Sequence, residues 1–386
     1  IKIFFFLIVF LELWIVIAIF GLVIAVVFAM YPTSVLPVWL EIPIAVYLGY
    51  LIYKKGANVM TWSIIAVIVM YITVFIGAYL PIKMPAIAGI PPTGVWTIIL
   101  LAYAFIASIL PVTTLLQPRD FINSHQLIVA LALLILGVFF TGIGGRLEIV
   151  APAVQLAPAK APPMWPFLFI TIACGAISGF HSLVSSGTSA KQVRNEQDSL
   201  FVGYGSMLLE GVLATLVIIA VSAGIGIAYT TKDGATLTGA AAWTTHYSSW
   251  AAAAGLGSKV SAFVDGSANM IATLGISKKF ALVIMGVFVA SFAGTTLDTA
   301  TRLNPIRQIS IETNPDDLVP GRLDPLRAAA CARAEGVPLV VEIWALLPRC
   351  WGTDPAIILA SVANAREGKH AMMKIWHANT GLSNPN

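Results

Sequence analysis

The sequence predicts an all-α integral membrane protein, a polytopic bundle of about eight spans. Of its 386 residues, 58% are hydrophobic and only 10% are charged, whereas an ordinary soluble domain carries about 25% charged residues. Backbone polar groups find no water in lipid, so apolar segments of about 20 residues are expected to be helices. The segments that meet or approach this length are 3–30, 36–53, 60–80, 94–116, 123–143, 165–187, 199–228 and 279–298.

Three regions depart from this pattern. The chain opens at Ile1 inside an apolar run, which we interpret as the absence of upstream residues, so the bundle is expected to be incomplete. Residues 229–277 contain no long apolar run and predict amphipathic or re-entrant helices on the outer side, with aromatic side chains typical of a membrane interface. Residues 1–303 are therefore predicted to form the membrane domain. Residues 304–386 are richer in charge and predict a polar tail, either disordered or the product of a frame change.

Several functions are disfavoured by what the sequence lacks. The net charge of +4 is spread along the chain without a basic cluster, so nucleic acid is not an expected partner. A Walker loop, a His-Glu-x-x-His motif and a Gly-x-Ser-x-Gly elbow are all missing, so we do not expect an enzyme. Cys174, Cys331 and Cys350 have no metal-ligand spacing, and neither a metal nor another cofactor is predicted.

The most informative polar stretch is 174–192, at the end of an apolar span. Its glycines and hydroxyls loosen a helix, and transporters use such broken helices to bind solutes within the membrane. Helix packing is the alternative, because Gly175 and Gly179 have the small-xxx-small spacing of close helix contacts. The residues predicted to bind substrate here are Ser178, Gly179, His181, Ser185, Ser186 and Thr188.

Two residues of this stretch have ionisable side chains. His181 lies in or near the membrane and titrates near neutral pH, so it is a candidate for proton coupling. The alternative is a neutral histidine with one structural hydrogen bond. Lys191 either attracts an anionic substrate or anchors the chain at the cytoplasmic interface.

A second polar stretch, 291–302, also ends an apolar span. Thr295 and Thr296 are predicted to complete the substrate site opposite the first stretch. Asp298 has two interpretations: it forms a helix ion pair with Arg302, four residues on, or it faces the pathway and holds a proton or cation.

Three other acidic residues lie in or near spans: Glu12, Glu41 and Glu210. Glu210 follows the first polar stretch most closely, so we predict it as the third proton- or ion-coupling residue, with His181 and Asp298. Arg119 and Asp120 occupy a predicted joint between spans, where a local ion pair or an interface anchor is expected.

Several of these motifs, in this order, resemble the carbon starvation protein A family. The resemblance covers about residues 1–303 and ends where the polar tail begins. The residues that carry it are Gln117–Asp120, Ile170–His181, Ser185–Thr188, Gly203–Glu210, Phe263–Gly266 and Thr295–Arg302.

This resemblance implies a multi-pass transporter of the prokaryotic cytoplasmic membrane, induced by carbon starvation. Its expected partners are the bilayer, a substrate that is pyruvate or a peptide, and a coupling ion, with a proton favoured. The family is related to the amino acid–polyamine–organocation transporters, so a similar bundle with broken helices and inverted repeats is implied. A membrane sensor that binds the same solute without moving it is the alternative function.

Overall fold

The computed structural model describes residues 2–110, 113–154, 156, 161–177, 180, 184, 189, 193, 198–231 and 234–302. It is almost entirely helical, with one two-stranded hairpin. The long helices are α1 (Lys2–Met30), α2 (Val35–Lys55), α3 (Val59–Gly77), α4 (Pro92–Ile109), α5 (Leu116–Ile143), α6 (Met164–Ile177), α8 (Asp198–Ile219), α12 (Leu256–Ala272) and α13 (Lys278–Arg302). The short elements are η1 (Pro32–Ser34), η3 (Ala220–Gly224), α9 (Ile225–Ile227), β1 (Tyr229–Thr230), β2 (Thr236–Leu237), α10 (Gly239–His246) and α11 (Trp250–Ala253).

Seven of the eight predicted spans correspond to helices long and apolar enough to cross a membrane, within the residues that the structure describes. The remaining prediction, 165–187, begins as α6, which has 14 residues, and most of residues 178–187 lie outside the described part of the chain. Between 229 and 277 the chain forms the β1–β2 hairpin and the helices α10, α11 and α12, with no candidate span in its described part. The prediction of a polytopic helical bundle is therefore confirmed.

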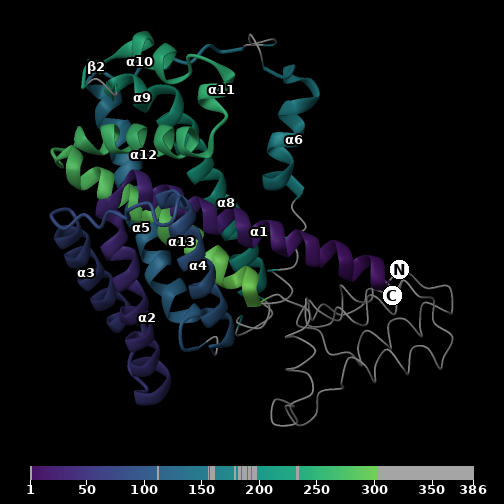
Figure 1. Cartoon of the computed structure of the whole chain (residues 1–386). Coiled ribbons are helices and arrows are strands. Elements are labelled where there is room, and N and C mark those ends of the chain that lie inside the picture. The colour runs from purple at the N-terminus through teal and green to yellow at the C-terminus, as the bar shows by residue number, and fades with distance from the viewer. Residues whose placement is uncertain are drawn as a thin grey trace, which may run out of the picture. The chain divides into compact units, whose positions relative to one another are not determined.

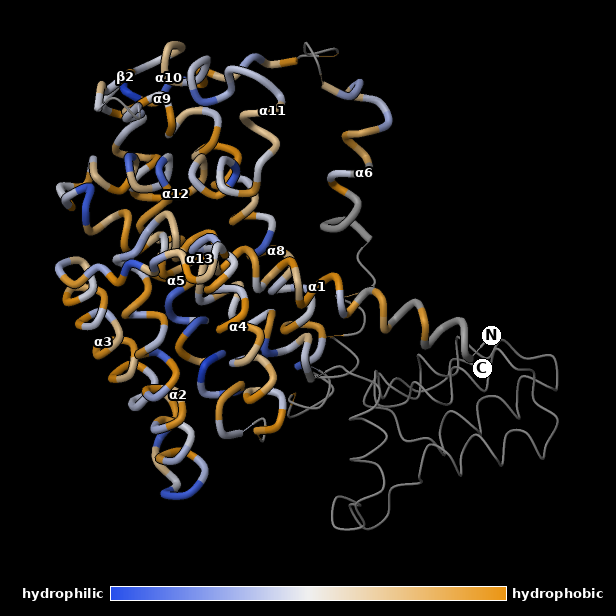
Figure 2. Tube along the Cα trace, in the orientation of Figure 1, coloured by the Kyte–Doolittle hydropathy of each residue, from blue (hydrophilic) through white to orange (hydrophobic). Residues whose placement is uncertain are grey.

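Helix α3 shows how these helices suit a lipid environment. Its inward face carries small and polar side chains, among them Ser63, Ala66 and Thr73, which are buried. Its outward face carries large apolar side chains such as Ile68 and Phe75, each 56% exposed. Small residues let helices approach closely in lipid, which also solvates the large outer side chains. Figure 2 shows the resulting predominance of hydrophobic residues along α1, α3 and α4.

The main hydrophobic core is built by buried residues of α1, α2, α3, α4, α5, α8, α12 and α13, and within it α2, α3, α4, α5 and α13 form one group of packed helices (Figure 1). Helix α13 is the centre of this group: its span is 61% buried, whereas the other candidate spans are between 28% and 39% buried. Because α13 contacts all four of the other helices, polar side chains on several of its faces meet partners from different parts of the sequence.

Helix α8 loses its regular pattern at its C-terminal end. It passes into the π-helical turn η3 and then into the single turn α9, which ends at Ile227. The Asn269 side chain on α12 compensates for the irregular backbone, because its Nδ2 donates to the carbonyl oxygens of Gly224, at 3.0 Å, and Ala228, at 2.7 Å. A π-turn within an α-helix is rare and commonly marks a functional position.

Replacing Asn269 with leucine is expected to lower the stability of the folded chain by about 1–3 kcal/mol, because both carbonyl groups lose a buried donor. Thermal unfolding in detergent would measure the change. Thr244→Val is the control, since Thr244 is exposed and donates only to carbonyl oxygens of its own helix. Equal melting temperatures for the two variants would contradict this role of Asn269.

Candidate functional site

Three helices of the core bring together three buried charged side chains. Arg119 on α5 donates from Nε to Glu41 Oε1 on α2, at 2.9 Å, and from Nη1 to Asp298 Oδ2 on α13, at 2.7 Å. Glu41 and Asp298 are completely buried, and Arg119 is 1% exposed. Burying charge is costly unless the charges are paired and hydrogen-bonded. This cluster meets that condition through one guanidinium placed between two carboxylates.

Two hydroxyl groups extend the cluster. Tyr103 on α4 accepts a hydrogen bond from Arg119 Nη1, at 3.1 Å, and donates one to Asp298 Oδ2, at 2.9 Å. Ser291 on α13 donates to Glu41 Oε2. Tyr103 is half-buried, and its ring packs edge-on against Trp39, with 5.8 Å between the ring centroids. We call the five residues Glu41, Tyr103, Arg119, Ser291 and Asp298 the charged cluster.

Local sequence explains how Arg119 reaches this position. Leu116–Asp120 form the first turn and a half of α5 and do not form a joint, and Pro118 is tolerated there because first-turn amides need no helical partner. Gly294 on α13 leaves room for the guanidinium, since a Cβ at that position would lie 3.1 Å from Arg119 Cζ. The prediction that Arg119 is an interface anchor or local pair in a joint is therefore wrong: helix α5 begins earlier than expected and carries it into the core.

Two further polar side chains of α5 continue the row that begins at Arg119. Asn123 and Gln126 follow it by four and seven residues, which places all three on one face of the helix. Asn123 Nδ2 donates to Thr295 Oγ1, and Thr295 donates in turn to the carbonyl oxygen of Ser291. Buried polar side chains of α5 and α13 therefore face each other beyond the charged cluster itself.

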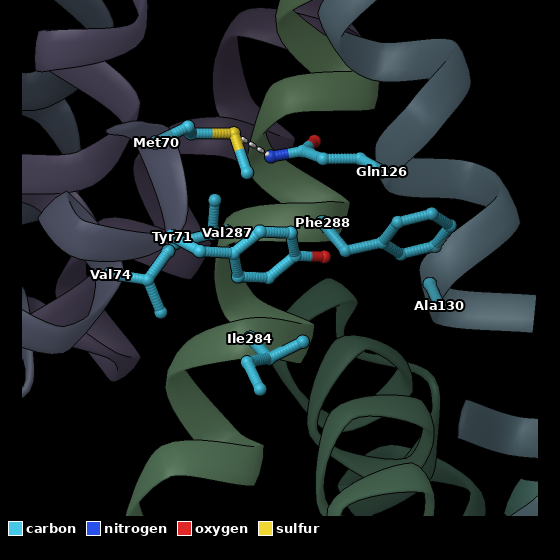
Figure 3. Close-up of a pocket in the computed structure, with 8 residues that line it drawn as sticks. All are labelled: Met70, Tyr71, Val74, Gln126, Ala130, Ile284, Val287 and Phe288. Atoms are coloured by element: carbon cyan, nitrogen blue, oxygen red, sulfur yellow. Dashed lines mark hydrogen bonds between the residues drawn. The ribbon is translucent and has the colours of Figure 1, made fainter. Parts of the chain in front are cut away.

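A small cavity lies beside this row, between α3, α5 and α13 (Figure 3). Its volume of about 10 Å³ is room for about one water molecule. Gln126 contributes the amide, whose Nε2 contacts Met70 Sδ, and Tyr71 points its hydroxyl toward Phe288. The cavity is too small for an organic substrate. The lining residues are Met70, Tyr71, Val74, Gln126, Ala130, Ile284, Val287 and Phe288.

The structure brings some predicted site residues together. Asp298 belongs to the charged cluster, and Thr295 joins it through Ser291. Thr296 is half-buried and donates to the carbonyl oxygen of Phe292 in its own helix. Glu210 lies on an exposed face of α8 and is not among the hydrogen-bond partners of the charged cluster.

The predicted residues of the first polar stretch lie outside the described residues. These are Ser178, Gly179, His181, Ser185, Ser186, Thr188 and Lys191. The side chains of Glu12 and Arg302 also lie outside the described part of the chain, as does the predicted polar tail. The proposed Asp298–Arg302 pair thus stays a prediction, whereas the ion pair between Asp298 and Arg119 is present.

Sequence reasoning missed Arg119, Tyr103, Asn123 and Ser291 as members of one site, and it ranked Glu210 above Glu41. One signal was available for α5: Arg119, Asn123 and Gln126 have helical spacing in an otherwise apolar segment. The partner of each residue could not be found in the same way, because Glu41 and Asp298 are separated from Arg119 by 78 and 179 residues.

A second polar contact involves a motif of the resemblance. Tyr31, between α1 and η1, donates to Asp265 Oδ1 on α12 at 3.2 Å. Burial raises the pKa of Asp265, while the hydrogen bond from Tyr31 and the charge of Lys278 lower it. Because α12 is not a candidate span, this contact connects the end of a span to the segment 229–277.

The fold and the charged cluster define a multi-pass helical membrane protein with paired ionisable groups buried among its spans. Within this class, the family model described as "Carbon starvation protein CstA" matches residues 1–313, so the chain belongs to that family. The match confirms the family predicted from the motifs and extends ten residues beyond the predicted limit of 303.

Curated relatives are named as transporters. The chain is 36% identical over 194 residues to "Peptide transporter CstA" of Helicobacter pylori, which is 49% of this chain and 28% of that protein. It is 35% identical over 222 residues to "Pyruvate/proton symporter BtsT" of Escherichia coli, which is 55% of this chain and 30% of that protein. The chain thus spans less than a third of these relatives' length. No solved structure matches it.

Proposed function

We propose that this chain is part of a secondary active transporter that takes up a small carboxylate or a peptide together with protons. Pyruvate and short peptides are the proposed substrates. The names of the two relatives support both substrate classes, and one of those names includes proton symport. A role in the response to carbon starvation is proposed from the family description.

The single observation that carries this proposal is the charged cluster. Ionisable side chains within membrane spans are costly, and they mark ion and substrate pathways more often than they serve packing. Here two carboxylates and a guanidinium come from three different candidate spans, α2, α5 and α13. An ion pair that only stabilises the fold needs one acid for one base. Arg119 has two carboxylate partners, and this second carboxylate favours a cluster in which ion pairs are exchanged or a carboxylate takes up a proton.

We propose that the bundle is similar to the amino acid–polyamine–organocation transporters, with residues 1–303 as the membrane domain in the cytoplasmic membrane of a prokaryote. The π-turn after α8, with the side chain of Asn269 on its carbonyl groups, supports a bundle that contains interrupted helices. His181 and Lys191 stay candidates for proton coupling and substrate attraction at the first polar stretch.

Uptake into proteoliposomes tests the proposal. Labelled pyruvate and a labelled dipeptide are offered separately, with and without an inward proton gradient, and protein-free liposomes serve as the control. We expect uptake of at least one substrate above the control level, and faster uptake with the gradient. Binding of a substrate without uptake or counterflow would favour a sensor, and neither binding nor uptake would reject the proposal.

A further inference from the structure

We propose that the charged cluster is a carboxylate-binding site in which protonation of Asp298 frees Arg119 to bind the carboxylate group of the substrate. This inference rests on the proposed function for its substrate class. It adds the group that is recognised and the reason why a proton accompanies it.

The substrate carboxylate and the acidic side chains of the cluster compete for one guanidinium group. Arg119 Nη1 donates to Asp298 Oδ2, and Nε donates to Glu41 Oε1. A substrate carboxylate has the same charge and geometry as these two side chains, so it competes with them for the same donors. It cannot join them without cost, because three buried carboxylates would then face one cation.

A proton on Asp298 releases Arg119 for the substrate. When Asp298 takes up a proton on a carboxylate oxygen, the carboxyl group becomes neutral, and its ion pair with Arg119 is lost. The proton neutralises one negative charge, and the incoming carboxylate adds one, so the total charge near Arg119 stays unchanged. Proton and substrate therefore bind together, and by linkage each raises the affinity of the other.

Geometry selects Asp298 over Glu41 as the proton acceptor. Tyr103 is half-buried, whereas Glu41, Arg119, Ser291 and Asp298 are at most 1% exposed. The Tyr103 hydroxyl donates to Asp298 Oδ2 and accepts from Arg119 Nη1. We propose that it passes its hydrogen to Asp298 and takes another from a donor outside the cluster. Glu41 contacts Arg119 and Ser291, which are both buried.

Three titratable groups that lie beside other parts of α13 are more distant. Tyr71 on α3 lies beside Phe288, ten residues before Asp298, which is roughly 15 Å along the helix. Asp265 on α12 and its partner Tyr31 lie near Lys278, at the start of α13 and roughly 30 Å along the helix from Asp298. The side chain of Arg302, one turn after Asp298, lies outside the described residues. Asp298 is hydrogen-bonded to Tyr103 on α4 and to Arg119 on α5, and Glu41 on α2 shares Arg119 with it.

Calorimetry of the detergent-purified chain tests this coupling without requiring transport. Pyruvate is titrated in two buffers of different ionisation enthalpy, so that the difference in heat gives the number of protons taken up. We expect the wild-type chain to take up about one proton per pyruvate bound, and its affinity to fall as the pH rises. Pyruvamide, which has no carboxylate, is the ligand control and is expected to bind at least about tenfold more weakly, because it cannot make the charge-assisted bonds.

Asp298→Asn removes the proposed proton acceptor. We expect this variant to bind pyruvate with almost no proton uptake and with a flat pH dependence, while Glu148→Gln, at an exposed position after α5, behaves as the wild type. The same titrations with a dipeptide and its C-terminally amidated form test whether the carboxylate is the shared determinant.

The outcomes separate this inference from the proposed function. Pyruvate binding without proton uptake in the wild type, equal affinity for pyruvamide, or undiminished proton uptake in Asp298→Asn would each overturn the inference. The wild-type and pyruvamide results decide it even if Asp298→Asn does not fold. Proton-linked binding together with no uptake in proteoliposomes would leave the carboxylate site intact and reject the transporter.

Discussion

Replacing Arg119 with glutamine is expected to destabilise the helix bundle by about 3–5 kcal/mol, because it leaves two buried carboxylates without their shared cation. Glu41 and Asp298 are both completely buried, so water cannot replace the lost charge. Arg119→Lys is also expected to be damaging. A lysine offers one compact ammonium group, whereas Arg119 reaches Glu41 through Nε and Asp298 and Tyr103 through Nη1.

Thermal or denaturant unfolding in detergent would measure this loss, with Arg146→Gln as the control because Arg146 is exposed. A triple variant, Glu41→Gln, Arg119→Gln and Asp298→Asn, removes every charge of the cluster and is expected to recover much of the stability, since whole buried ion pairs can often be replaced at little cost. A single Arg119→Gln variant as stable as the wild type would show that the cluster does not hold the core together.

Replacing Gly266 with alanine is expected to have the second large effect, at the crossing of α12 and the π-turn η3. A Cβ at Gly266 would lie 2.9 Å from the carbonyl carbon of Ala220 and even closer to its oxygen. The obstacle is backbone, which cannot rotate away as a side chain can. We expect a loss of about 3 kcal/mol, at the upper end of the usual range for overpacking.

Gly211→Ala is the matched control for this prediction, because Gly211 lies on α8, and a Cβ there would meet no heavy atom of the described residues within 4 Å. In a helix this control is expected to leave stability unchanged or to raise it by up to about 1 kcal/mol. In detergent, Gly266→Ala is therefore expected to melt at a lower temperature than the wild type, and Gly211→Ala at the same or a higher temperature. Similar melting temperatures for both variants would mean that α12 can shift away from η3 at little cost.

Local sequence was sufficient to predict several features of the fold. Helix α3 is an example, because it has 19 residues without a charge and ends where the composition changes. A backbone in lipid has to satisfy its own hydrogen bonds, so such a segment forms a helix. The same reasoning located the spans that became α2, α4, α5 and α13, and it predicted that residues 229–277 contain no long span; their described part holds no candidate span. It failed at the start of α5, because the charges of Arg119 and Asp120 were read as a polar joint, although the buried acids on other helices make Arg119 compatible with a helix in the core.

The candidate site was predicted only in part, for a different reason. Asp298 and Thr295 stood out because hydroxyls and a carboxylate are unexpected in an apolar helix. Glu41 looked the same as Glu210 in sequence, since each is a single acid in an apolar segment. Their different environments, one in the core and one on an exposed face, depend on helix rotation and packing, to which residues far away in the sequence contribute.

The sequence by itself determined that this is a polytopic helical membrane protein of the carbon starvation family, because hydrophobic length and ordered motifs are local properties of the chain. Only the tertiary structure decided that Glu41, Arg119 and Asp298 form one buried cluster. Charge pairing within the membrane depends on which helix faces meet, and α2, α5 and α13 meet through packing between segments far apart in the chain. A lone acidic residue in an apolar span predicts that a partner exists, but the packing of the helices determines which residue it is.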